Sequence, residues 1–112
     1  QKLEKQDFPI NELIEEIIKE TKLIDEKHEI RSVRNEPVVF HADRSLIKEA
    51  IRIFVDNSLK YTPEGGRIQL QCYPQNNHII ISIEDTGIGI PKEDLPHVFD
   101  RFYRADKSRT KD

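Results

Sequence analysis

The sequence predicts an α+β fold, a two-layer sandwich in which helices cover one face of a mixed sheet. Two segments carry apolar residues at helical spacing, and each is followed by a pair of short β-rich runs. The expected order is therefore helix, two strands, helix, hairpin and loop. Parallel crossovers do not dominate this order, which favours a mixed sheet over an all-parallel one. The 112 residues are enough for one such domain.

The composition excludes several classes of protein. Eighteen basic and 21 acidic residues leave a net charge of −3, which argues against a general nucleic-acid binder. The single cysteine, Cys72, excludes an internal disulfide framework and a four-cysteine zinc site. No apolar run approaches the ~18 residues that cross a bilayer, and no signal peptide is visible. Because the chain begins at Gln1 and has no methionine, we expect it to be a piece of a longer polypeptide.

The first helix is expected over residues 12–26, with Asn11 as its N-cap. Its apolar residues recur at helical spacing, and they are Leu13, Ile14, Ile17, Ile18 and Ile24. Residues 1–7 are polar, so we expect no regular element there. Two short strands joined by a turn at residues 35–36 fit the stretch 29–40.

The second helix is expected over residues 44–60, with Asp43 as its N-cap. Its apolar face contains Leu46, Ile47, Ala50, Ile51, Phe54 and Tyr61. The run TPEGG at residues 62–66 ends the helix. A strand, a hairpin turn and a second strand then follow at residues 68–72, 74–77 and 78–83. A short helix could open at residues 91–95.

Three polar clusters could carry chemistry, and the first lies in the last turns of the second helix. Asn57, Lys60 and Tyr61 are three and four residues apart and therefore lie on neighbouring ridges. An amide oxygen suits Mg²⁺, a lysine ammonium suits phosphate, and an aromatic ring can cover a base. The alternative is an ordinary polar last turn, in which the helix dipole favours the lysine.

The second cluster is the run DTGIGIP at residues 85–91, directly after an apolar strand. Its glycines allow close approach to a flat ligand, its isoleucines can contact the ring faces, and its aspartate can accept from an exocyclic amine such as that of adenine. The residues concerned are Asp85, Gly87, Ile88, Gly89 and Ile90. The alternative is a plain glycine-rich turn. The run is neither a dinucleotide fingerprint nor a P-loop.

The third cluster is the run VFDRFYR at residues 98–104. Phe99 and Phe102 would hold the segment against the core, which leaves Arg101 or Arg104 to reach an anion. An amphipathic surface helix is the alternative.

Taken together and in this order, the three segments resemble the GHKL superfamily. The closest likeness is to the catalytic, ATP-binding (Bergerat-fold) domain of bacterial sensor histidine kinases. Residues 43–66 are similar to the N box, 84–91 to the first glycine box and 96–104 to the F box. The likeness extends from about Phe8 onward. The F box favours the kinases over the gyrase, mismatch-repair and chaperone branches.

Individual roles follow from the resemblance. It implies that Asn57 binds Mg²⁺ and that Lys60 contacts the phosphates. It implies that Asp85 recognises the adenine amine and that Arg104 approaches the terminal phosphate. Further nucleotide-contacting residues that it implies are Tyr61, Gly87, Ile88, Gly89, Ile90 and Phe102. The expected catalytic residues are Asn57, Lys60 and Arg104.

The sequence departs from the family pattern in two ways. A second asparagine usually lies one turn before Asn57, and here that position is Ile53, which cannot bind a metal. We also expect residues 1–112 to be a single ATP-binding domain that lacks the second glycine box and the C-terminal elements. Because backbone amides at a helix N-terminus hold phosphates, such a fragment should hold triphosphate poorly and should not autophosphorylate alone.

The resemblance implies a domain of a two-component sensor histidine kinase. With ATP and Mg²⁺ it would transfer a phosphoryl group to a histidine on a separate helical dimerisation domain. The implied partners are that domain and a downstream response regulator, without nucleic acid. The full-length protein would be a homodimer, with this domain on the cytoplasmic side of a membrane-anchored sensor. Alternatives are a degenerate, non-catalytic nucleotide-binding or interaction module, and an ATPase with a conformational cycle.

His28 opens a run, HEIRS, that is similar to the start of the kinase phosphoacceptor box. That box belongs on a helical hairpin far before the N box, whereas Asp43 follows only fifteen residues later. We therefore assign this segment to the first strand of the sheet and not to a phosphoacceptor.

Overall fold

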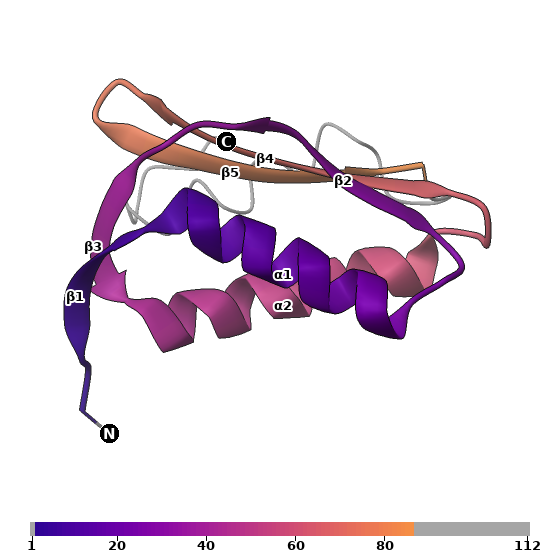
Figure 1. Ribbon diagram of the computed structural model, residues 1–112, viewed down its shortest axis with the longest axis horizontal. Helices are drawn as coiled ribbons and strands as arrows, with labels where there is room; N and C mark the ends of the chain where they lie inside the picture. The colour runs from indigo at the N-terminus through magenta and orange to yellow at the C-terminus, as the bar shows by residue number, and fades with distance from the viewer. Residues whose placement is uncertain (1, 87–112) are drawn as a thin grey trace, which may run out of the picture.

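The computed structural model describes residues 2–86, which form two helices on one face of a three-stranded sheet (Figure 1). A two-stranded ribbon lies at one end of this sandwich (Figure 1). In chain order the elements are β1 (Lys5–Pro9), α1 (Ile10–Ile24), β2 (Glu29–Asn35), β3 (Val39–Asp43), α2 (Arg44–Tyr61), β4 (Arg67–Gln75) and β5 (His78–Asp85). The α+β class and the placement of both helices on one face are confirmed.

The main sheet has the order β2-β4-β5 and is mixed, as predicted. β2 runs parallel to β4, and β4 runs antiparallel to β5. Asn76 and Asn77 form the hairpin turn with φ of 51° and 66°. Asparagine tolerates this left-handed conformation, and two such residues match the twist of the flanking strands. Pro74, expected in the turn, instead lies in β4 opposite Ile79.

The β1–β3 ribbon was not predicted. β1 pairs antiparallel with β3, so residues 5–7, where no regular element was expected, lie in a strand. β2 and β3 lie in different sheets and do not form the expected hairpin. The reason lies between them: the Asn35 side chain donates to the backbone carbonyl of Asn11 at 3.0 Å. In addition, Ile10 donates its N–H to the carbonyl of Val38 at 3.0 Å. The chain therefore crosses the start of α1 before it pairs again.

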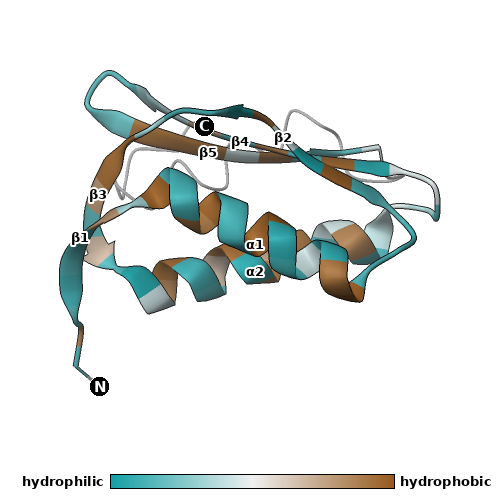
Figure 2. Ribbon diagram, viewed as in Figure 1, coloured by the Kyte–Doolittle hydropathy of each residue, from teal (hydrophilic) through white to brown (hydrophobic). Residues whose placement is uncertain are grey.

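Helix α1 begins two residues earlier than predicted, and the expected N-cap at Asn11 is wrong. Pro9 occupies the cap position, and Asn11 lies inside the helix, where its Oδ1 accepts from the N–H of Val38 at 3.2 Å. The buried face of the helix consists of Ile10, Leu13, Ile14, Ile17, Ile18 and Thr21. Apolar and hydrophilic bands alternate along the helix in Figure 2, which is the pattern of an amphipathic helix. Ile24 was assigned to this face but is 75% exposed, since the helix ends there.

Helix α2 begins as predicted. Asp43 is its N-cap, and Oδ1 accepts from the N–H of Leu46 at 3.2 Å. Hydrogen bonds from the backbone N–H groups of Glu4 and Leu46 lower the pKa of the Asp43 carboxyl. Of the predicted apolar face, Ile51 is fully buried, whereas Leu46 and Tyr61 are 37% and 47% exposed.

The hydrophobic core lies between the helices and the sheet and includes Ile14, Ile51, Leu70 and Ile83, each no more than 1% exposed. Neither of the helices between residues 2 and 86 has the length and apolar character of a membrane span. The two helices are also joined by ion pairs at the surface. Glu16 pairs with Arg44 at 2.7 Å and with Lys48 at 2.6 Å.

Candidate functional site

The predicted residues of α2 form one exposed stripe. Asn57, Lys60 and Tyr61 are all exposed, and Ile53 lies one turn before Asn57 and is 55% exposed. The ammonium of Lys60 is 5.4 Å from the ring centroid of Tyr61, within the range of a cation–π contact. The stripe thus presents an amide, a cation and an aromatic ring side by side, while Ile53 adds an apolar group.

A second, buried stripe runs beside it on α2. Ser58 is 3% exposed, and Thr62, directly after the helix, is 4% exposed. Both lie on the same side of the helix as the core residues Ile51 and Val55. Thr62 closes the helix, because its N–H donates to the carbonyl of Ser58 at 3.0 Å. The hydroxyl of Thr62 has no hydrogen-bond partner among the residues that the structure describes. The helix therefore becomes polar toward the sheet just where the exposed cluster lies.

Asp85 is the last residue of β5 and is only 3% exposed. A carboxylate in such a place is costly unless its surroundings or a ligand compensate it. The next residue, Thr86, is fixed to the neighbouring strand. Its N–H donates to the carbonyl of Arg67 at 3.2 Å, and its Oγ1 accepts from the N–H of Arg67 at 3.1 Å. These bonds hold the end of β5 in register with the start of β4.

Residues 62–66 lead from the end of α2 to the start of β4, and they pack against the residue that follows β5. Gly66 is in close contact with Thr62 and Thr86: a β-carbon at this position would meet the Thr62 methyl and would lie 2.8 Å from the Thr86 Oγ1. It would also lie 2.9 Å from the carbonyl oxygen of Pro63. Only glycine allows this approach. The close packing brings the segment after Tyr61 against the residue after Asp85.

His28 lies just before β2 and belongs to this region, which the sequence did not indicate. Its Nε2 is 2.6 Å from the carbonyl oxygen of Thr62, and its Nδ1 is 3.1 Å from the carboxylate of Asp25. The exclusion of His28 as a phosphoacceptor therefore has a physical basis, since both ring nitrogens are engaged and the side chain is 6% exposed. Asp25, His28 and Thr62 are the residues of this region that sequence reasoning missed. No periodicity connects residues so far apart in the chain.

The described residues fit Mg²⁺ only as a partial site. Asn57 is exposed and offers an amide oxygen, the kind of hard ligand that Mg²⁺ accepts. The neighbouring Asp56 lies 3.6 Å from Arg52 in an ion pair. Within residues 2–86 no three metal-binding side chains cluster together. A magnesium ion here would depend on phosphate oxygens and water for most of its ligands.

The other expected site residues cannot be placed in the same way. Gly87, Ile88, Gly89, Ile90, Phe102 and Arg104 lie outside the described residues. Helix α2 brings together Asn57, Lys60 and Tyr61. Asp85 is linked to the end of this helix by the packing of Thr86 against Gly66, which also contacts Thr62. A common cavity for Asn57 and Asp85 stays a prediction.

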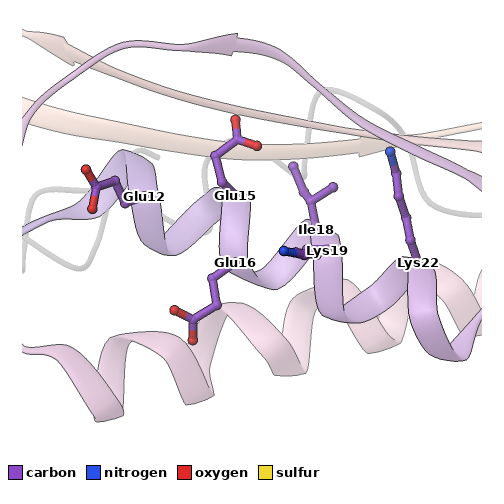
Figure 3. A pocket seen from close by; sticks show the side chains of 6 residues that line it. All are labelled: Glu12, Glu15, Glu16, Ile18, Lys19 and Lys22. Carbon is purple, nitrogen blue, oxygen red and sulfur yellow. The ribbon is translucent and has the colours of Figure 1, made fainter.

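A hollow on the surface of α1 is a separate feature, and it contains none of these candidates. Its described lining consists of Glu12, Glu15, Glu16, Ile18, Lys19 and Lys22. Figure 3 shows that these side chains all project from α1 in different directions, and that Glu16 points toward α2. The hydrogen bond from Lys48, followed by that from Arg44, lowers the pKa of Glu16. Among these charged residues, Glu16 forms ion pairs with Arg44 and Lys48 of α2.

The sequence relatives of this chain are histidine kinases within a family of ATPases. The family described as histidine kinase-, DNA gyrase B- and HSP90-like ATPases matches residues 42–112. The signal transduction histidine-protein kinase ArlS of Staphylococcus haemolyticus (strain JCSC1435) is 37% identical over 112 residues, which is 99% of this chain and 25% of the relative. The sensor histidine kinase WalK of Bacillus subtilis (strain 168) is 39% identical over 84 residues, or 73% of this chain and 14% of the relative. The chain thus spans a quarter or less of the length of these relatives.

Solved structures show the same fold. A histidine kinase ThkA in complex with the response regulator protein TrrA has a TM-score of 0.72 and 28% identity, over 90% of this chain and 31% of that one. The mycobacterial sensor histidine kinase MprB has a TM-score of 0.70 and 26% identity, over 91% of this chain and 68% of that one.

Proposed function

The chain belongs to the histidine kinase-, DNA gyrase B- and HSP90-like ATPase family, and on this premise we propose how its residues bind Mg·ATP for phosphoryl transfer to a histidine. It is similar to the ATP-binding catalytic part of sensor histidine kinases. Phosphoryl transfer depends on positioning and on charge neutralisation more than on covalent chemistry by the protein. The exposed groups of α2 and the carboxylate at the end of β5 are suited to these tasks.

The observation that carries the proposal is the burial of Asp85. This carboxylate ends an apolar strand, is 3% exposed and lies one residue from Thr86, which packs on Gly66. In a desolvated position a carboxylate is a strong acceptor for the exocyclic amine of adenine, and it would reject the carbonyl oxygen that guanine has there. The proposal therefore assigns base selection to Asp85.

The phosphate end of the site would lie along the exposed stripe of α2. Lys60 would place its ammonium near the phosphates as a point charge, and Tyr61 would contact the nucleotide beside it. The Lys60 ammonium lies 5.4 Å from the Tyr61 ring centroid, so both groups could face the same ligand. Arg104, with Lys60 and Asn57, completes the proposed catalytic set. Gly87, Ile88, Gly89, Ile90 and Phe102 complete the nucleotide contacts.

Mg²⁺ would be held by the amide oxygen of Asn57. When bound it would neutralise charge on the β- and γ-phosphates. Ile53 offers no second ligand one turn earlier, and its side chain is 55% exposed. We therefore expect the ion to be held mainly by the phosphates, with an affinity lower than an asparagine at position 53 would provide.

The wider assignment follows the relatives and is a proposal for the whole protein. It would be a two-component sensor kinase, and the phosphoryl group would pass to a histidine on a separate helical dimerisation domain. A response regulator would receive it next; ThkA was solved in complex with one. Residues 1–112 would act as a single ATP-binding domain on the cytoplasmic side of a membrane-anchored homodimer.

Calorimetric titration with ATP, with and without Mg²⁺, tests the proposal. We expect binding that strengthens with Mg²⁺ in the parent and loses this dependence in Asn57→Ala. A matched control is Glu49→Ala, an exposed residue of the same helix, which should bind as the parent does. Binding that ignores Mg²⁺ in the parent would instead indicate a nucleotide-binding module without phosphoryl-transfer chemistry.

A further inference from the structure

We propose that His28 is a positioning residue for the nucleotide site, which it serves by fixing the end of α2 through the carbonyl group of Thr62. This inference rests on the proposed function, because it concerns how firmly the proposed ATP-contacting residues are held. We call the hydrogen bonds that link Asp25, His28 and Thr62 the His28 clamp.

The clamp is a continuous chain of hydrogen bonds that are largely shielded from solvent. Nε2 of His28 lies 2.6 Å from the carbonyl oxygen of Thr62, and Nδ1 lies 3.1 Å from both carboxylate oxygens of Asp25. The backbone N–H of His28 also donates to Asp25 at 3.1 Å. The side chains of His28 and Asp25 are only 6% and 14% exposed. Water competes little for these bonds, so the ring is fixed at both nitrogens.

The chemistry of the partners sets the direction of each bond. A carbonyl oxygen can only accept, so Nε2 of His28 must be the donor to Thr62. The ionised carboxylate of Asp25 likewise accepts from Nδ1. Asp25 therefore orients the imidazole, and the imidazole in turn holds a backbone atom of the helix end. Because both partners are acceptors, each ring nitrogen must carry a proton, so the clamp requires the imidazolium form of His28.

Two backbone bonds add to the clamp. The N–H of Gly65 donates to the carbonyl of Lys27 at 2.7 Å, and the N–H of Glu29 donates to the carbonyl of Gly66 at 2.9 Å. Residues 27–29, at the start of β2, thus hold residues 62–66 by three hydrogen bonds. Of these three bonds, only the one from His28 is made by a side chain, and it is therefore open to substitution.

The held segment touches both sides of the proposed site. Thr62 directly follows Tyr61, and Gly66 packs against Thr86, which directly follows Asp85. A shift of Thr62 would therefore move the lysine and aromatic ring relative to the adenine-recognising carboxylate. Small displacements of binding groups cost large factors in activity. An apolar side chain at position 28 would fill the space but leave the carbonyl without its donor.

A matched pair of variants separates positioning from packing. In His28→Gln the side-chain amide reaches as far as Nε2 and keeps a donor for Thr62, whereas in His28→Asn the amide reaches only as far as Nδ1. We expect His28→Gln to bind ATP within about twofold of the parent, and His28→Asn to bind about tenfold more weakly. Both are measured well below their own unfolding temperatures, so loss of fold does not enter. Equal affinity of the two variants would overturn the inference.

A spectroscopic measurement addresses the clamp without nucleotide. In the parent protein, ¹H–¹⁵N spectra should show a slowly exchanging proton on Nε2 of His28 and protected amides at Gly65 and Gly66. An Nε2 without a proton would contradict the clamp. Weak ATP binding by the parent is expected, whereas a complete absence of binding at saturating ATP would contradict the proposed function. If the parent binds ATP and His28→Asn binds equally well, only the present inference is wrong.

Discussion

The α-carbon of Gly66 faces the hydroxyl of Thr86 so closely that an added β-carbon would lie 2.8 Å from Oγ1. That hydroxyl already accepts from the N–H of Arg67. Since Thr86 follows Asp85, and Gly66 lies in the segment that follows α2, the contact joins the two halves of the proposed site. Its closeness sets a strict limit on residue size at position 66.

Gly66→Ala should therefore disturb both stability and binding. The new methyl would also meet the backbone carbonyl of Pro63 at 2.9 Å, so the neighbours cannot simply rotate away. We expect a loss of about 1–3 kcal/mol in the free energy of unfolding, together with weaker ATP binding. Chemical denaturation and calorimetry measure the two effects.

Gly65→Ala is the matched control. Gly65 has a φ of 91°, but apart from its chain neighbours no atom of residues 2–86 lies within 4 Å of an added β-carbon. Its cost is backbone strain of about 1–2 kcal/mol. Because the Gly65 N–H also bonds the carbonyl of Lys27, ATP affinity should fall, but by less than in Gly66→Ala. If Gly66→Ala bound ATP as tightly as Gly65→Ala, the contact between Gly66 and Thr86 would have no role in the site.

The surface ion pairs between the helices predict a dependence of stability on pH. The hydrogen bond from Lys48 lowers the pKa of Glu16, and that bond in turn raises the pKa of Lys48. Glu16 therefore stabilises the folded state at pH values above its unfolded pKa, and this stabilisation is lost as the pH falls through its folded pKa. The contribution of Lys48 is present below its unfolded pKa and is lost as the pH rises through its folded value. Solvent screening keeps the total below about 1 kcal/mol.

Glu16→Gln tests this dependence. In the variant, the free energy of unfolding should fall less than in the parent as the pH is lowered from 7 to 3. Urea denaturation at each pH measures this quantity. Glu12→Gln is the control, because Glu12 is exposed on the same helix and forms no ion pair with another residue between positions 2 and 86. Identical pH profiles for Glu16→Gln and the parent would contradict the prediction.

Cys72 should be unreactive in the folded protein. It is fully buried in β4, and desolvation, with a smaller effect from Glu36, raises the pKa of its thiol to about 12. Because the thiolate is the reactive form, a thiol reagent at pH 8 should modify Cys72 only as the protein unfolds. The folded state also disfavours ionisation, so Cys72 reduces stability as the pH rises above its unfolded pKa. Rapid labelling without denaturant would contradict the burial.

Ile53 provides a test by gain of function. It is 55% exposed on the same stripe as Asn57, so Ile53→Asn should change the free energy of unfolding by no more than about 0.5 kcal/mol. The new amide would add a ligand one turn before Asn57, and Mg²⁺-dependent ATP binding should become tighter. Ile53→Leu is the control and should bind as the parent does. Tighter binding in Ile53→Leu as well would show that the amide is not responsible.

Much of the fold follows from local patterns in the sequence. The apolar spacing of Leu13, Ile14 and Ile17 predicts the buried face of α1, and Asp43 marks the start of α2. The alternation along β4 and the pair Asn76 and Asn77 predict the hairpin. These features depend on residues close together in the chain, where helix and strand periods can be compared directly.

The parts that were missed depend on contacts between distant residues. The β1–β3 ribbon pairs Phe8 with Phe40, and no period in the polar segment 1–7 indicates a strand. Asn35 was expected in a turn between two paired strands, but its side chain donates a hydrogen bond to the carbonyl of Asn11 in α1. His28 was assigned to the first strand, and its bond to Thr62, which spans 34 residues, was not foreseen. Tertiary partners of this kind override local preferences.

The selection of adenine by Asp85 is the central claim, and one comparison tests it most directly. ATP and GTP are titrated against the parent and against Asp85→Asn, with Mg²⁺ present. The parent should prefer ATP, and the variant should lose about 1.5–3 kcal/mol of ATP binding because a charged acceptor is replaced by a neutral amide. Equal binding of ATP and GTP by the parent, or unchanged ATP binding by Asp85→Asn, would contradict the claim.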